Sequence, residues 1–359
     1  MSNRALSVSL ESLDYNSDTV SWCQETVALC AEIGATVVIG TFVSEPRTLL
    51  LDRSPVVSDA VQQLHDQGLA VVLIIDNWYS HLDLSWIGAD DLVWVDYQMW
   101  RSYHWLTVAH NHKFPSNRNS NWNSQAQHLL FLTGKPDRPN RVRLLWKLHR
   151  AGLLPQTLWS FFGQGAPFEN IQSQVPEESA DDLRRLMLQW ERNLDNIQVH
   201  YRGHSMHGTP WPQDPAIYQQ SLFRIISESW YPAENRLAHP IYTEKTCMTL
   251  MNSVPWLIMA GEPGLCKYLE SLGFDSFQWA LALPYDHVVD PETRMDIIVI
   301  NAQHWLTRQF DTNQMALSVQ ANWHVARSMV MDQAVAINTM LQRNGIDMPA
   351  DQALPWTKI

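Results

Sequence analysis

The sequence predicts an α/β protein with two Rossmann-like domains and a helical C-terminal segment. Strand and helix patterns alternate over the first hundred residues, the pattern stops over residues 102–127, and the alternation then begins again. Strands that alternate with helices of this length are typical of a parallel sheet with helical crossovers. We therefore place one domain at residues 1–120, a second at 121–310, and C-terminal helices at 311–359 that pack across or back on the first domain.

The first domain contains four predicted strands and two predicted helices. The strands are residues 5–12, 36–43, 69–76 and 91–97, and the helices are residues 20–33 and 55–66. The third strand, LAVVLIID, is a continuous apolar run, as expected of a buried parallel strand. For the second helix we expect Ser54 as the N-cap, Pro55 at the first helical position and Gly68 at the end.

The second domain follows a polar stretch, residues 102–127, which we interpret as a linker or a long functional loop. After this stretch the predicted strands are residues 128–133, 157–162, 221–227 and 255–260. The predicted helices are residues 141–151, 177–193 and 264–272, and from about residue 291 to residue 344 the chain is mostly helical. Gly152 and Gly273 are the expected stops of the first and third of these helices.

Composition excludes several classes of protein. The net charge of −12, from 37 acidic and 25 basic residues, disfavours a general grip on a nucleic-acid backbone, although residues 138–150 are rich in Arg and Lys. The four cysteines form no CxxC pair and match no zinc spacing, which indicates a reducing compartment. Without a signal-peptide pattern or an apolar run of about 18 residues, we expect a cytoplasmic protein (host cytoplasm if viral) with no membrane partner.

The segment around residues 242–254 carries the strongest chemical signal. Thr243 is a predicted N-cap of an apolar helix, and Glu244 in the first turn suits the helix dipole. Lys245 in the same turn opposes the dipole, unless an anion lies at the helix start. Free backbone N–H groups and a lysine form a phosphate site, and Glu244 can accept hydrogen bonds from a ribose diol. The alternative is an ordinary capped helix with a solvated Glu–Lys pair.

The run Tyr242-Thr243-Glu244-Lys245, followed by an apolar helix and by the run VPWLI, resembles the signature of the family-10 α-fucosyltransferases. It is more similar still to a group of bacteriophage and giant-virus glycosyltransferase-like proteins. Those proteins carry a T-E-K-T helix, an apolar strand, a Gly-rich turn and then YL…LGF.TF. The present chain has the corresponding residues in the same order: Gly261, Gly264, Lys267-Tyr268-Leu269, Leu272-Gly273-Phe274 and Phe277.

The resemblance implies a GT-B fold, in which two Rossmann-like domains face a cleft. It also implies a glycosyltransferase that moves a sugar from a nucleotide-diphosphate sugar to a hydroxyl acceptor. By the same resemblance, the helix at residues 140–148 would place Arg141 on the donor diphosphate. The implied donor-binding residues are Arg141, Glu228, Tyr242, Thr243, Glu244 and Lys245, with Tyr242 near the nucleotide, Glu244 on the ribose and Lys245 on a phosphate.

No cofactor or metal is expected. The sequence has no convincing D-x-D motif, which fits a metal-independent site where helix dipoles and basic side chains stabilise the leaving diphosphate. No G-x-G-x-x-G follows the first strand, which disfavours a nicotinamide cofactor. The cluster His200, His204 and His207 matches no zinc spacing, and a sugar or phosphate contact is an alternative role for it.

The acceptor hydroxyl needs a general base, which we expect beyond the carboxyl ends of the first domain's strands. Asp76 ends the third strand, Glu45 follows the second and Asp96 lies in the fourth. We prefer Asp76, then Glu45, as the catalytic residue. For each of them, a strand-end turn or a helix cap is the alternative role.

Two other interpretations of the whole chain stay open. One is a non-catalytic virion or structural protein that retains the glycosyltransferase fold. The other is a different two-domain α/β enzyme, such as an epimerase-like nucleotide-sugar protein. The acceptor stays open too: a modified base in phage DNA, a glycan or a protein, with the net acidity disfavouring DNA.

Overall fold

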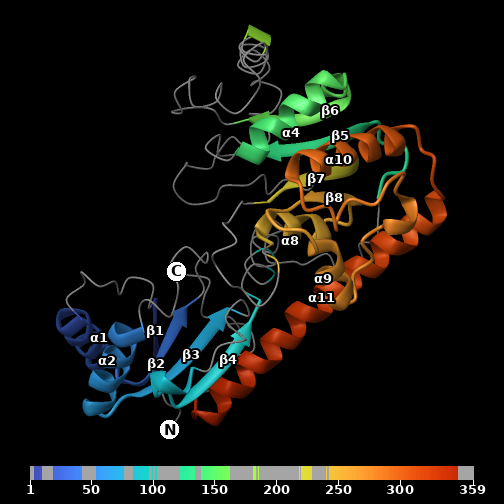
Figure 1. The fold of residues 1–359 in the computed structure, drawn as a ribbon. Coiled ribbons are helices and arrows are strands. Elements are labelled where there is room, and N and C mark those ends of the chain that lie inside the picture. Colours follow the sequence, from blue (N-terminus) through green and yellow to red (C-terminus); the bar gives the residue numbers. More distant parts are fainter. Residues whose placement is uncertain are drawn as a thin grey trace. The chain divides into compact units, whose positions relative to one another are not determined.

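Figure 1 shows the fold of the protein as a computed structural model. The described residues are 4–9, 19–42, 54–76, 84–96, 99, 102, 122–133, 139–161, 181–182, 185, 218, 220–228, 240 and 242–346. The chain divides into two compact units, and each is described by itself. Unit 1 comprises residues 1–101, 234–238 and 328–359, and unit 2 comprises residues 102–233 and 239–327.

Unit 1 is built on a four-stranded parallel sheet. Its strands lie in the order β1-β2-β3-β4, with bounds β1 Arg4–Ser9, β2 Ala35–Phe42, β3 Ala70–Asp76 and β4 Asp91–Val95. Helices α1 (Thr19–Ile33) and α2 (Ser54–Asp66) connect the first three strands, and the short 3₁₀ helix η4 (Ser85–Ile87) precedes β4. The predicted strands are confirmed, because each coincides with an observed strand to within a few residues.

The end of α2 follows the sequence pattern. Gly68 has a φ of +75°, a left-handed conformation that costs glycine little, and its N–H donates to the carbonyl of His65 at 2.8 Å. Leu69 then returns its N–H to the carbonyl of Leu64, and β3 begins one residue later. The predicted helix stop is therefore confirmed.

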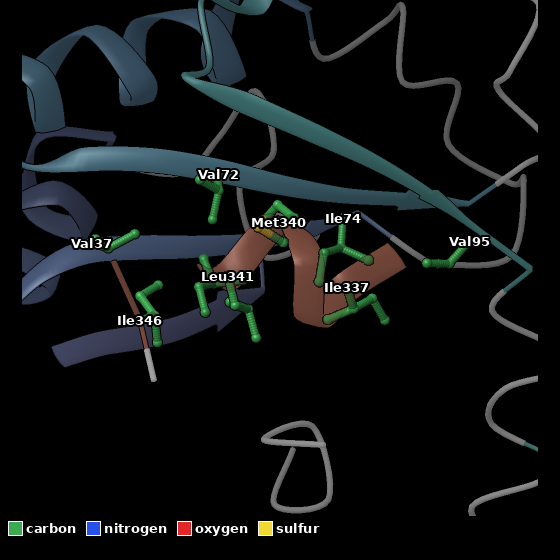
Figure 2. Packing of buried hydrophobic residues seen from close by; sticks show 9 residues of the cluster. Val37, Val72, Ile74, Val95, Ile337, Met340, Leu341 and Ile346 are labelled. Atoms are coloured by element: carbon green, nitrogen blue, oxygen red, sulfur yellow. The ribbon is translucent and has the colours of Figure 1, made fainter. Parts of the chain in front are cut away.

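A long C-terminal helix covers one face of this sheet. Helix α11 (Thr312–Arg343) belongs to unit 1 from Ser328 onward. Figure 2 shows its residues Ile337, Met340 and Leu341 beside the strands. The buried cluster consists of Val37, Ile39, Val72, Ile74, Val95, Ile337, Met340, Leu341 and Ile346. Since the intervening strand residues Val38, Val71 and Leu73 are also buried, both faces of the sheet are covered, as in other parallel sheets.

Unit 2 contains a second four-stranded parallel sheet, and its strand order is not sequential. The order is β6-β5-β7-β8, with bounds β5 His128–Thr133, β6 Thr157–Phe161, β7 Ser221–Ser227 and β8 Trp256–Met259. The chain steps from β5 to β6 on one side and later returns to β7 on the other side. The carboxyl ends of β5 and β7 therefore flank a topological switch point, where open α/β sheets bind ligands.

Helices cover both faces of this second sheet. The ring of Phe223 on β7 lies 5.2 Å from that of Trp305 on α10 (Pro291–Leu306), whereas the next residue, Arg224, bonds to α8 (Glu244–Met251). Adjacent strand residues point to opposite faces, so α8 and α10 lie on opposite sides of the sheet. The remaining elements are η5 (Leu154–Gln156), α9 (Leu265–Ser271) and η7 (Gln278–Ala280).

Helix α4 (Pro139–Arg150), which follows β5, runs parallel to α10. Arg143 pairs with Glu292 at 3.0 Å, and Lys147, one turn later, pairs with Glu292 at 3.2 Å and with Asp296 at 2.5 Å. Because residue numbers rise together along both helices, the two N-termini lie at the same end. Helix α4 begins beyond the carboxyl end of β5, so α10 also begins at the carboxyl edge of the sheet.

The expectations for the rest of the chain have mixed outcomes. The helical C-terminal region is confirmed, although the helical structure is interrupted at residues 307–311, between α10 and α11. Most of the predicted linker at 102–127 and of the helix at 177–193 lies outside the described residues. Among the described helices, none combines the length and the apolar character that a membrane span requires.

Candidate functional site at the carboxyl edge of the second sheet

The start of α4 is tied to the end of β7 at the switch point. Asn140, which is buried, donates from Nδ2 to the Oγ of Ser227 at 3.2 Å and to the carbonyl of Glu228 at 2.9 Å. Glu228 in turn donates its N–H to the carbonyl of Met259 at the end of β8, at 2.9 Å. The polar groups that follow β5, β7 and β8 are therefore fixed relative to one another.

The carboxylate of Glu228 occupies the N-terminus of α8. The side chain is 0% exposed. Its Oε1 accepts the N–H of Thr243 at 3.0 Å, the N–H of Thr246 at 3.3 Å and the hydroxyl of Thr246 at 2.5 Å. Its Oε2 accepts the hydroxyl of Thr243 at 2.6 Å. A carboxylate here satisfies N–H groups that the helix leaves unpaired and interacts favourably with the helix dipole.

Lys245 completes this cluster. Its ammonium donates to the hydroxyl oxygen of Thr243 at 2.9 Å and lies 3.9 Å from Oε2 of Glu228. Thr243 is the N-cap, since its Oγ1 accepts the N–H of Lys245 at 3.4 Å, which confirms the cap predicted from the sequence. From the sequence we expected an anion near the ammonium of Lys245 at this helix start. In the structure the carboxylate of Glu228 is such an anion.

The other predicted donor-binding residues lie nearby in the fold or outside what the structure describes. Tyr242 is buried, with its ring 6.1 Å from the ring of Tyr268 on α9. Arg141 is the third residue of α4 and is buried. Glu244 is the first residue of α8, but its side chain lies outside the described residues. The structure thus brings Glu228, Thr243 and Lys245 into contact and places Arg141 in the first turn of the helix that Asn140 anchors.

The sequence did not lead us to single out two arginines of unit 2 that the structure shows to be buried. Arg224 is 1% exposed, and its Nη1 donates to the carbonyl of Lys245 at 3.2 Å and to the hydroxyl of Thr249 at 2.8 Å. The same Nη1 donates to the hydroxyl of Tyr218 at 3.1 Å. No carboxylate pairs with Arg224 within the described part of the chain. A lone arginine inside the apolar strand SLFRIIS was the sequence signal that could have identified it.

The second buried arginine is Arg294, in the first turn of α10. It is 2% exposed, and its Nη2 donates to the carbonyl of Gly261, two residues beyond β8, at 3.1 Å. Burial lowers the pKa of the guanidinium, while the nearby carboxylate of Asp286 acts in the opposite direction. In the sequence this arginine looks like an ordinary helix charge, and no local pattern indicates that it is buried.

Among the described residues, the buried charges are mostly cationic in unit 2 and anionic in unit 1. Among the described residues of unit 2, the buried ionic side chains are four cations and one carboxylate: Arg141, Arg224, Lys245, Arg294 and Glu228. In the described part of unit 1 they are two carboxylates, Asp76 and Asp96. Buried charge is costly unless it is compensated. The majority of cations among the buried charges described in unit 2 is a local feature, because the chain as a whole has a net charge of −12.

The candidate bases lie at the carboxyl edge of the first sheet. Asp76 is the last residue of β3, and Asp96 directly follows β4, whose final residue Val95 is the register partner of Asp76. Oδ1 of Asp96 accepts the N–H of Met99 at 2.9 Å, so this carboxylate serves as a local cap. Glu45 and the histidines at 200, 204 and 207 lie outside the described residues.

Within the described residues, the metal-binding and thiol groups form no second site. Across the described ranges, no group of three or more His, Cys, Asp or Glu side chains is arranged to hold a metal ion. All four cysteines are buried free thiols, and burial raises the pKa of Cys23 to about 11. Comparisons with protein-family models, with curated proteins and with solved structures find no match for this chain.

The role of Glu228 is testable by an isosteric change. Glu228→Gln removes the charge that balances Lys245 and replaces one of the two acceptor oxygens with an amide NH2, a donor that faces other donors. We expect the free energy of unfolding to fall by about 3 kcal/mol, as for a buried ion pair that loses one partner. Chemical denaturation measures the loss.

Glu262→Gln is the matched control, because Glu262 is an exposed carboxylate in the turn that follows β8. We expect this change to alter stability by less than about 0.5 kcal/mol. If the two variants were equally stable, the carboxylate of Glu228 would not be what holds the first turn of α8.

Proposed function

We propose that the carboxyl edge of unit 2 binds the nucleotide-diphosphate part of a sugar donor, and that the protein is a glycosyltransferase. The observation that carries this proposal is a set of buried cations at this edge, Arg141, Lys245 and Arg294, of which Arg294 has two guanidinium nitrogens, Nε and Nη1, with no hydrogen-bond acceptor among the described residues. The phosphates of a nucleoside diphosphate would supply acceptors for the unused donors of Arg294.

The position of these charges supports a nucleotide ligand. They belong to elements that begin or end beside the reversal of strand order between β5 and β7, where doubly wound sheets hold nucleotides. The N-termini of α4, α8 and α10 all lie at this edge, and helix N-termini are favourable positions for phosphates. The resemblance of residues 242–258 to sugar-nucleotide transferases points to the same ligand class.

The chemistry of transfer follows from this arrangement without a metal. As the bond from the sugar to the diphosphate breaks, negative charge grows on the leaving oxygens. Arg141 and Lys245 would stabilise that charge, since guanidinium groups bind phosphate oxygens in pairs and an ammonium acts as a point charge. Glu244 would bind the ribose and Tyr242 would pack near the nucleotide, as the resemblance implies.

Glu228 has a supporting role in the proposal. Its contacts with Thr243 and Thr246 fix the first turn of α8, and its charge holds the ammonium of Lys245 at this edge. The ammonium of Lys245 is buried and already donates to Thr243, so a phosphate that approaches it would not have to displace a full hydration shell. The lysine is therefore held in place before the ligand arrives, which lowers the ordering cost of binding.

Ligand-dependent stability tests the donor site. We expect one nucleotide among GDP, UDP, CMP and dTDP, or its sugar, to raise the unfolding temperature of the wild type by a few degrees. A ligand at about 100 times its Kd adds about 2.7 kcal/mol to the folded state. Lys245→Ala should lose most of this gain in a thermal-unfolding assay.

Lys267→Ala is the control, because Lys267 is an exposed lysine on the neighbouring helix α9. It should retain the full nucleotide shift. If no nucleotide stabilised the wild type, the transferase proposal would give way to a structural protein that keeps the fold.

The general base is tested separately from binding. Asp76→Asn removes the carboxylate that we assign as the base. Because this residue is not among the proposed donor-binding residues, we expect the nucleotide to raise the unfolding temperature of the variant as much as that of the wild type. Release of nucleotide from the cognate nucleotide sugar, with water or an acceptor as nucleophile, should slow by about 100-fold or more.

Asp96→Asn is the matched change, since Asp96 is the neighbouring buried carboxylate and caps the N–H of Met99. It should leave the rate of release within a few-fold of the wild type. A larger rate loss in Asp96→Asn than in Asp76→Asn would reverse the assignment.

A further inference from the structure

Arg294 is a buried cation with unused hydrogen-bonding capacity. Its Nη2 donates to the carbonyl of Gly261, but its Nε and Nη1 have no acceptor in the described part of the chain. A guanidinium carries five N–H donors, and leaving buried donors unsatisfied is costly. An apolar side chain of similar length would avoid that cost.

The carboxylates nearest to Arg294 already have other partners. Asp286 accepts the N–H groups of Cys266 at 3.0 Å and Lys267 at 3.1 Å, and so caps α9. Asp290 accepts the N–H and hydroxyl of Thr293, at 2.8 and 2.5 Å, as the N-cap of α10. Hydrogen bonds from Thr293 lower the pKa of Asp290. Neither carboxylate forms a salt bridge with the guanidinium, although both act on its charge through space.

The location of Arg294 connects it to the candidate site. The carbonyl of Gly261, to which it donates, lies two residues beyond Met259, whose own carbonyl accepts the N–H of Glu228. Arg294 and Arg141 occupy the first turns of two parallel helices, α10 and α4, on one face of the sheet. Lys245 belongs to α8 on the opposite face. Cations therefore approach the carboxyl edge from both faces.

We propose that Arg294 is a diphosphate-binding residue, which makes the site select nucleoside diphosphates over monophosphates. This inference rests on the proposed function. Two groups of cations on opposite faces of the sheet edge suit an anion with two phosphates better than one with a single phosphate. The guanidinium is 2% exposed and spends one nitrogen on the carbonyl of Gly261, so its Nε and Nη1 remain available to donate to a phosphate.

The test compares Arg294→Met with the wild type by titration calorimetry. The probes are the stabilising nucleoside diphosphate, the matching monophosphate, inorganic pyrophosphate and inorganic phosphate. Loss of a charged hydrogen bond corresponds to roughly a 10- to 100-fold loss of affinity. We expect this loss for the diphosphate and for pyrophosphate, and a change of less than about three-fold for the monophosphate.

Stability separates a binding role from a structural one. Because the arginine is buried with two donors unsatisfied, replacement by the apolar methionine should leave the unfolding temperature unchanged or raise it. Arg143→Met is the control, since this partly exposed cation of α4 pairs with Glu292 on the same helix as Arg294. It should retain the wild-type preference for diphosphate.

The failures are distinguishable. If the wild type binds nucleoside diphosphates and Arg294→Met binds them equally well, the inference is wrong and the donor site stands. It is also wrong if mono- and diphosphate affinities fall by the same factor, or if the variant unfolds several degrees lower with its affinities intact. If the wild type binds neither nucleotides nor pyrophosphate, the proposed function itself fails.

Discussion

The hydrogen bonds between the carboxylate of Glu228 and the first turn of α8 are the interaction on which the candidate site depends. A single buried anion accepts two N–H groups and two hydroxyls from Thr243 and Thr246, and it lies 3.9 Å from the ammonium of Lys245. Since Glu228 directly follows β7 and its N–H bonds to β8, this carboxylate links the sheet to the helix start. Asn140 donates to the backbone carbonyl of Glu228 and so connects the start of α4 to the same group of residues.

Among the described residues of unit 2, buried cations outnumber buried carboxylates. Glu228 balances one of the four buried cations, and within the described residues Arg224 and Arg294 have no carboxylate partner of their own. A chain selected for stability alone would gain from apolar residues at such positions. Departures from local stability rules are expected at functional sites, where a ligand supplies the missing interaction. Arg141, Lys245 and Arg294 are buried at the same edge of the second sheet as the strand reversal, and this coincidence supports a phosphate-bearing ligand there.

Much of the fold was predictable because it is encoded in local patterns. Continuous apolar runs such as LAVVLIID indicate buried parallel strands, and Gly68 marks a helix end. Both signals depend only on neighbouring residues in the sequence. The order β6-β5-β7-β8 was not predictable in this way, because strand pairing between distant segments leaves no trace in hydrophobic periodicity. The interruption at residues 307–311 falls in a stretch that was expected to be mostly helical, and no proline marks it.

The candidate site was predictable in part. The cap at Thr243 is a local feature, and the resemblance singled out Arg141, Glu228 and Lys245, all of which are buried at one edge of the sheet. What the sequence could not provide was the partner of each group. Glu228 lies 18 positions before Thr246, and Arg294 lies 33 positions after Gly261, so only the folded chain shows that these residues meet. Arg224 was overlooked although a charge inside an apolar strand is itself a signal.

Hydrogen exchange of the backbone amides, with and without the nucleotide panel, tests the central claim most directly. We predict that one nucleotide slows exchange at the first turns of α4 and α8, residues 140–143 and 243–246, while the second half of α11 is unaffected. Slowed exchange confined to unit 1, or no change at those two helix starts with any nucleotide, would contradict a donor site at the carboxyl edge of the second sheet.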